Sequence, residues 1–418
     1  MKLSKAAFAV LLLAGAAHAQ VAQPPRTINV SREEETAINA LATAAALPNR
    51  PAQDAALAAA RAASRSAEGR YAVARYQLDI ARARSDAQMY NQAVDALVES
   101  GLAPPDEMAS LLFNQASRAY GAGDMVRTER LLARSVEIAP NNVEALTDYG
   151  QFKSRINNRA TAAADRQLAV QLFSRAIEAN RAAGRASSES LHRRALAVAF
   201  DGTRPPLSLA QLGPQAVALA RALVAAYPSQ VNWRDALLVY RDVAAVGDAE
   251  LRLDIGRLMR ASGALAGERD YLEAAQALTT ASPGEAKTVL DDGASRQMLD
   301  ATKPAVAQAI AAANRQATAT RATLPRLRTQ AAAGTAAQAR AAGDAHFAAG
   351  QYAEAAQLYG LALQKGGEDP NLVNSRLGAS LALAGRRPEA EAALHAVTGP
   401  RADLAGFWLA WLARRPAA

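Results

Sequence analysis

Apolar side chains recur at intervals of three and four residues through most of this chain, which is the spacing of one face of an α-helix. Segment 343–363 contains two such runs, one ending at Gly350 and the other carrying Tyr359. Glycine and proline stand mostly between the periodic runs, where they end helices. Alternating runs rich in Val, Ile and Thr, which would indicate strands, are hard to find. The pattern therefore predicts an all-α fold.

Pairs of predicted helices with the same layout recur along the chain. Each pair places small residues on both helices and glycine or aspartate in the turn, as in segments 114–142, 343–363 and 377–397. The turn glycines Gly350 and Gly385 are 35 residues apart. Small residues let two helices cross closely, and larger side chains fill the space beside them. Because one hairpin cannot bury its apolar face alone, we expect neighbouring hairpins to stack.

This layout resembles the tetratricopeptide repeat, a helical hairpin with a period of about 34 residues. The resemblance is clear over about half of the chain and looser over most of the remainder. It implies a right-handed α-solenoid built from such hairpins. On this basis we expect an N-terminal array over 31–200, a divergent helical middle region over 201–335, and C-terminal hairpins with a capping helix over 336–413. We expect residues 414–418 to be a tail.

Local signals predict how several helices begin and end. Ser31 and Glu34 have the spacing of a capping box at a helix start. Ser282 is expected to cap a second helix. The connection before the second helix of one hairpin is lengthened over 157–165. The segment 302–342 predicts a long helical pair broken at Leu324-Pro325.

The N-terminus has the order of features found in a secretory signal peptide. Two lysines precede an apolar run over 6–13, which leads to the small-residue sequence Ala17-His18-Ala19. We expect a signal peptide over 1–19, cleaved after Ala19, and a flexible leader over 20–30. The apolar run is too short to span a bilayer as a permanent anchor, and no later run reaches that length. These features predict export to the periplasm and a mature chain without a transmembrane segment.

Composition narrows the class of sites that the chain can contain. The chain has no cysteine, which excludes disulfides and thiolate metal sites. The formal charge of +8 falls to +6 when Lys2 and Lys5 leave with the signal peptide, because 8 − 2 = 6. Arginines are dispersed among acidic residues, which indicates solvated helix faces and disfavours a nucleic-acid surface. Weak attraction to an anionic lipid or polymer stays open.

No catalytic motif is found in the sequence, which lacks the patterns of the common hydrolase, nucleotide, dinucleotide and calcium sites. The three histidines outside the signal peptide are His192, His346 and His395, and His346 falls where a packing residue is expected. Glu268 and Asp270 suit the start of a helix. We therefore expect no enzymatic activity, no cofactor and no metal.

Tetratricopeptide proteins usually hold a peptide or a partner's helix on the face lined by their first helices, and the resemblance implies the same here. One subset of the family binds a C-terminal carboxylate through Lys, Arg and Asn at set positions. In this chain the candidates for contact with a partner are Asn114, Arg340, Asn374 and Arg376. They do not reproduce that carboxylate-binding arrangement. We favour the interpretation that each is an ordinary polar residue of the surface.

The resemblance leaves two functions open. The first is a periplasmic scaffold or adaptor that binds proteins or peptides of the cell envelope. Assisting the assembly of these proteins is one role that such a scaffold could have. The alternative is a tetratricopeptide component of an exopolysaccharide synthesis or export system. In neither case is nucleic acid an expected partner.

The segment 404–415 is unusual because it holds two of the chain's three Trp. Its apolar residues form one helical stripe, made up of Leu404, Trp408, Trp411 and Leu412. We expect this helix to cover the otherwise exposed end of the last hairpin. The alternative is an exposed aromatic patch that recruits a partner or a membrane surface.

Overall fold

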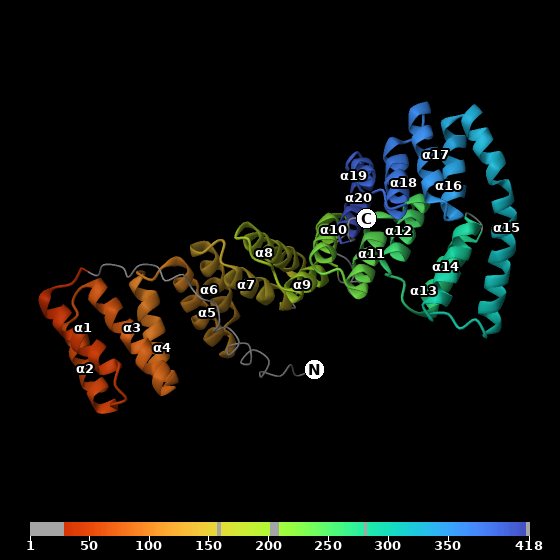
Figure 1. Cartoon of the computed structure of the whole chain (residues 1–418). Coiled ribbons are helices and arrows are strands. Elements are labelled where there is room, and N and C mark those ends of the chain that lie inside the picture. Colours follow the sequence, from red (N-terminus) through yellow and green to blue (C-terminus); the bar gives the residue numbers. More distant parts are fainter. Residues whose placement is uncertain (1–28, 157–159, 201–208, 280–281, 415–418) are drawn as a thin grey trace. The chain divides into compact units, whose positions relative to one another are not determined.

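The computed structural model describes residues 29–156, 160–200, 209–279 and 282–414 (Figure 1). Helix accounts for 81% of these residues, and none of them lies in a strand. The all-α prediction is confirmed. The predicted signal peptide lies outside the described residues, as does most of the leader.

The chain divides into two compact units, Met1–Ala186 and Ser187–Ala418. The boundary follows α8, so the predicted middle region and the predicted C-terminal hairpins belong to one unit. None of the described helices combines the length and the apolar character needed to cross a membrane.

In the first unit, consecutive helices pack in pairs and each pair contacts the next. Contacts between α1 and α3 and between α5 and α7 show that the first helices of successive pairs also touch. The helices of this unit are α1 (Arg32–Ala45), α2 (Arg50–Ala63), α3 (Ala67–Arg84), α4 (Ala87–Ser100), α5 (Pro105–Gly121), α6 (Met125–Ile138), α7 (Val143–Arg155) and α8 (Ala162–Ala182).

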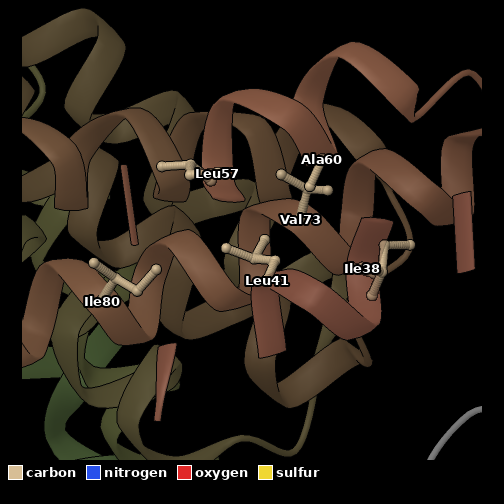
Figure 2. Close-up of a cluster of buried hydrophobic side chains, with 7 residues drawn as sticks. Ile38, Leu41, Leu57, Ala60, Val73 and Ile80 are labelled. Atoms are coloured by element: carbon tan, nitrogen blue, oxygen red, sulfur yellow. The ribbon is translucent and has the colours of Figure 1, made fainter. Parts of the chain in front are cut away.

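The first pair of helices forms a core together with α3. Figure 2 shows the buried side chains that meet there, namely Ile38, Leu41, Leu57, Ala60, Val73 and Ile80. They come from three helices, so the first hairpin buries its apolar face only with the help of the next one. The predicted capping box at Ser31 and Glu34 is present at the start of α1.

The second unit begins with the same sequential packing and then closes on itself. Its last helix contacts α10 and α12 as well as α18 and α19 (Figure 1). The helices are α9 (Glu189–Ala199), α10 (Leu209–Ala226), α11 (Gln230–Ala244), α12 (Ala249–Ser262), α13 (Gly267–Leu278), α14 (Pro283–Ser295), α15 (Pro304–Ala333), α16 (Ala336–Ala348), α17 (Tyr352–Lys365), α18 (Pro370–Leu383), α19 (Arg387–His395) and α20 (Ala402–Leu412), with a short 3₁₀ turn, η3 (Gly399–Arg401), before α20.

The aromatic helix α20 is buried, as the lid interpretation expects. Leu404, Phe407 and Trp408 are each at most 1% exposed, which excludes an exposed patch built on these side chains. The rings of Phe407 and Tyr240 lie 5.3 Å apart, so α20 also packs on α11. The helix therefore covers more than the last hairpin.

The prediction of a break at Pro325 is wrong, because α15 runs without interruption from Pro304 to Ala333. A proline inside a helix removes one backbone hydrogen bond and costs about 3 kcal/mol. Here Leu324 on one side of the proline and Ala331 on the other are both buried on the same stripe. Their packing keeps the two halves of the helix in line.

Close helix crossings depend on glycines that face large side chains. A Cβ added at Gly343 of α16 would lie 2.8 Å from the Tyr359 ring of α17, and one added at Gly378 of α18 would lie 2.6 Å from Leu394 of α19. In the first unit, Gly150 of α7 faces Phe173 of α8 at 3.0 Å in the same way. Three hairpins therefore use the same contact between the first and the second helix.

This contact yields a prediction with an internal control. Gly343→Ala should lower the free energy of unfolding by about 1–3 kcal/mol, because the buried Tyr359 ring must move. Gly360→Ala in α17 meets no atom within 4 Å. It should raise the free energy of unfolding by about 0.4–1 kcal/mol, since alanine loses less backbone entropy. Urea unfolding of both variants checks the pair, and equal effects of the two substitutions would contradict the packing.

The Glu34 carboxylate predicts a pH dependence of stability. It accepts hydrogen bonds from the backbone N–H groups of Ser66 at 2.6 Å, Ser31 at 2.9 Å and Arg65 at 2.7 Å. The bonds from Ser66 and Ser31 contribute most to lowering the pKa of Glu34 from 4.5 to about 2. A lowered folded pKa gives stability that is full above about pH 4.5 and is lost as the pH falls toward about 2.

We therefore expect the difference in unfolding free energy between the wild type and Glu34→Gln to shrink between about pH 5 and pH 2. Urea titrations at several pH values measure this difference. As a control, Glu33→Gln removes an exposed carboxylate from the same turn and should leave the wild-type pH dependence in place.

Candidate functional site

The first unit contains a hollow of about 550 Å³ where the α5–α6 turn meets the end of α7 and the start of α8. It is open to solvent on one side. Its lining combines apolar and charged side chains, contributed by Tyr120, Met125, Val126, Glu129, Phe152, Lys153, Arg155, Ile156, Thr161 and Asp165.

The apolar wall of this hollow is unusually exposed. Val126 is 71% exposed and Met125 47%, although both are large apolar residues at the start of α6. Behind them the rings of Tyr120 and Phe152 meet edge to face, with centroids 6.4 Å apart. Exposed apolar groups gathered around a concavity mark a site where another molecule can be bound.

Lys153 forms the charged side of the hollow. Its Nζ donates to Asp165 Oδ1 at 2.7 Å and also binds Glu129, while the Tyr149 ring lies 5.9 Å away. Burial acts against the charge of Lys153, but the hydrogen bonds to Asp165 and Glu129 outweigh burial and raise its pKa. Burial likewise opposes the charge of Asp165, and the bond from Lys153 still lowers the pKa of that carboxyl. The Lys153 ammonium group is therefore paired with two carboxylates.

The arrangement is suited to binding another molecule. The apolar wall can take an aliphatic or aromatic side chain, and Glu129 and Arg155 offer one charge of each sign to the polar groups of a ligand. In the described part of the chain, no group of three or more His, Cys, Asp or Glu side chains is placed to hold a metal ion.

Sequence reasoning did not identify this hollow. The one signal that pointed to it was the late start of α8, which leaves the connection 156–161 between α7 and α8. Ile156 and Thr161, at the two ends of this connection, line the hollow. The segment 157–159 itself lies outside the described residues.

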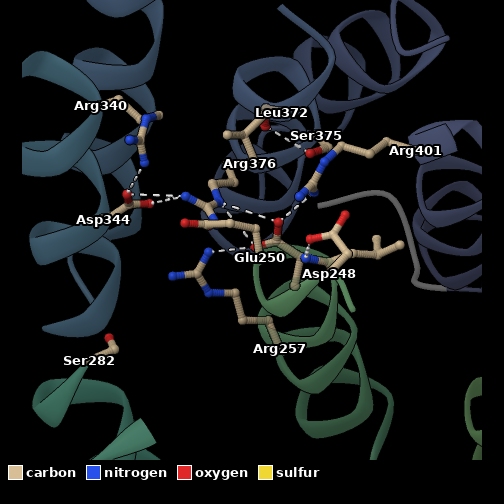
Figure 3. Close-up of polar contacts among 12 residues, drawn as sticks. Asp248, Glu250, Arg257, Ser282, Arg340, Asp344, Leu372, Ser375, Arg376 and Arg401 are labelled. Carbon is tan, nitrogen blue, oxygen red and sulfur yellow. Dashed lines mark hydrogen bonds and ion pairs between the residues drawn. The ribbon is translucent and has the colours of Figure 1, made fainter. Parts of the chain in front are cut away.

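A second concentration of charge lies inside the second unit, around Asp254 of α12. Three arginines bind its carboxylate: Arg376 Nε of α18 at 3.1 Å, Arg257 of the same helix at 2.7 Å, and Arg401 of η3 at 2.6 Å (Figure 3). Burial opposes the charge of Asp254, but the guanidiniums of Arg376, Arg257 and Arg401 outweigh it and hold the pKa of the carboxyl below its usual range. These ion pairs join α12 to the C-terminal helices.

Asp344 of α16 continues the network. It binds Arg376 at 3.0 Å (Figure 3). It also accepts a hydrogen bond of 2.7 Å from the Tyr359 hydroxyl. Burial raises the pKa of Asp344 above its usual value despite these contacts. On α14, Glu285 forms an ion pair with Arg257 at 2.6 Å.

The predicted cap at Ser282 differs from what the structure has. Ser282 stands at the N-cap position of α14, but its side chain makes no hydrogen bond to the helix backbone. Its hydroxyl instead donates to Glu285 Oε1 at 2.7 Å. The ion pair of Glu285 with Arg257 holds that carboxylate where it can accept the bond.

The structure brings two of the four candidate partner residues together. Arg340 and Arg376 share Asp344, and Arg340 also binds Glu368 at 2.6 Å. Arg376 is only 2% exposed, so the interpretation of this arginine as a surface residue is wrong. Its charge is used inside the unit because Glu250 and Asp254 of α12 form ion pairs with it.

The other two candidates lie apart from that cluster. Asn114 of α5 accepts a hydrogen bond of 3.1 Å from the Tyr90 hydroxyl and donates one of 2.8 Å to the Ser110 carbonyl. Asn374 is half-buried on α18. Contact of these residues with a partner stays a prediction.

Comparison with known proteins adds no relative, since no family model matches the chain and no curated protein matches it.

The arginine cluster generates a stability prediction. Arg376→Met removes a cation that the buried Asp254 and the partly buried Asp344 share, and should lower the free energy of unfolding by about 3–5 kcal/mol. Arg386→Met breaks an exposed ion pair with Glu389, in which both side chains are about half exposed, and should cost about 1 kcal/mol or less. Urea unfolding compares the two variants. Similar small losses for both would show that the cluster does not hold the unit together.

Proposed function

We propose that the chain is a non-enzymatic scaffold or adaptor that binds a protein partner through the hollow of α5–α8. The observation that carries this proposal is the exposure of Val126 and Met125 beside a concavity with aromatic walls. A helical protein gains no stability from leaving such residues in water, so their position is better accounted for by a bound partner.

The chemistry of the hollow defines what the partner presents. A segment of the partner could place one aliphatic or aromatic side chain in the hollow, against the apolar wall formed by Met125 and Phe152. Flanking polar groups would meet Glu129 and Arg155 at the edge. Because Lys153 is paired with Glu129 and Asp165, the hollow has no strong net charge. Recognition of the partner therefore rests on shape and on the burial of apolar surface.

The class of scaffold is proposed from the sequence and from the packing together. The hairpins resemble tetratricopeptide repeats, and the contact of a first-helix glycine with a large residue of the second helix supports that resemblance. The signal-like N-terminus adds the proposal that the partner is an envelope protein met in the periplasm.

Site-specific photocrosslinking in cells tests the proposal. A photoreactive side chain at Val126 should capture one discrete partner, whereas the same group at Val246, which is 69% exposed in the second unit, should capture none. The match in exposure makes Val246 a control for random collision. Equal capture of the same proteins at both positions would overturn the proposal.

A pair of charge substitutions provides the matched control. Val126→Asp should abolish formation of the complex with the captured partner, because a carboxylate would enter the apolar wall. Val246→Asp should leave it intact. Both substitutions lie on the surface and should change the free energy of unfolding by no more than about 0.5 kcal/mol.

A further inference from the structure

The long helix α15 carries positive charge that nothing in its own sequence neutralises. Between Asp300 and Asp344 the chain has no acidic residue at all. Within this stretch α15 alone bears four arginines, at Arg315, Arg321, Arg326 and Arg328.

These four arginines are free of partners in the structure. All four are exposed, and within the described ranges none of them takes part in an ion pair or a hydrogen bond of its side chain. The cations that flank the helix behave differently. Lys303 binds Glu268 at 2.8 Å, and Arg340 binds Glu368 at 2.6 Å. Lys303 and Arg340 are thus paired with carboxylates, whereas the arginines of α15 are not.

The helix presents its arginines in two rows. Its buried stripe consists of Val306, Ala313, Leu324 and Ala331 and faces α14, α16 and α17. At about 100° per residue, Arg315 and Arg326 fall in one row and Arg321 and Arg328 in a second, about 120–160° away around the helix. The four lie within about 20 Å along the axis, at the edge of the unit (Figure 1).

The exposed surface between and around these rows has no apolar anchor. The large apolar residues that are exposed in the described part of the chain lie on other segments, at Leu47, Met125, Val126, Val231 and Val246. A membrane-inserting helix needs aromatic or aliphatic side chains on its outer face, and an apolar protein interface needs similar anchors. The exposed surface of α15 therefore suits a partner that binds through charged groups and needs no apolar contact.

We propose that α15 is a docking surface for an extended acidic segment of a partner protein. Each guanidinium can bind a carboxylate through two parallel hydrogen bonds, a geometry that lysine does not offer. An extended segment of about six residues spans the ~20 Å over which the arginines are spread. This inference rests on the proposed function in so far as the partner is a protein, but the surface is separate from the hollow of α5–α8.

The test measures binding of a fluorescent peptide of six glutamates with Gly-Ser ends to the purified full chain by fluorescence anisotropy. The variant replaces all four arginines of α15 by glutamine, which keeps helix propensity. Its matched control carries Arg32→Gln, Arg50→Gln, Arg130→Gln and Arg134→Gln. These four positions of the first unit are exposed, and their side chains make no ion pair or hydrogen bond with the described residues. Both variants lose the same charge, and circular dichroism verifies that both keep their helix content.

We expect the α15 variant to bind the peptide on the order of 30-fold more weakly than the wild type, and the control less than about threefold more weakly. Binding by the wild type should also fall steeply as salt rises, since exposed charges are screened. Equal weakening of both variants would show a general effect of net charge and would overturn the proposal.

Two further probes test the choice of partner. Alginate oligomers carry carboxylates on a sugar chain, and vesicles of phosphatidylglycerol carry phosphates on a lipid surface. If either probe binds more tightly than the peptide, and if this binding depends on the four arginines, the occupant is of that probe's class and the proposal of an acidic protein segment is wrong. Because the peptide assay uses only purified protein, its failure leaves the crosslinking result at Val126 unaffected, and the two proposals fail separately.

Discussion

The contact on which both units depend is the crossing of two helices where a small residue of one meets a large residue of the other. Gly343 against Tyr359 and Gly150 against Phe173 bring the helix backbones close enough for the second helix to bury its apolar side chains. A single hairpin still leaves one face uncovered, so each pair must pack on the next. This constraint explains why successive helices contact one another throughout both units.

The second unit meets the same constraint in a different way at its C-terminal end. Its last helix turns back onto α10–α12, and the arginines of the C-terminal segment bind Asp254 in the interior. Arg376 lies on α18, the first helix of its hairpin, where a repeat protein could use it to bind a partner. Here it binds Asp254 inside the unit instead. Among the described residues, the two features that we propose for binding are the hollow of the first unit and the unpaired arginines of α15.

Local signals predicted local structure at Ser31, where no distant contact interferes, and failed at Ser282 and Pro325, where packing or an ion pair decides the outcome. The capping box at Ser31 involves residues three positions apart, and the sequence pattern was sufficient to find it. Proline at 325 suggested a break because local propensity says nothing of the packing on either side. The burial of Arg376 depends on Asp254, 122 positions earlier in the chain, and no pattern in the sequence joins them. The hollow arises from four helices and a connection, so only their arrangement reveals it.

Hydrogen exchange of the complex between the protein and its crosslinked partner tests the central claim most directly, because it reports protection along the whole chain. The account predicts slower exchange in the segments 120–129 and 152–156, which line the hollow, when the partner is bound. A stable complex in which these segments exchange at the rate of the free protein would contradict it.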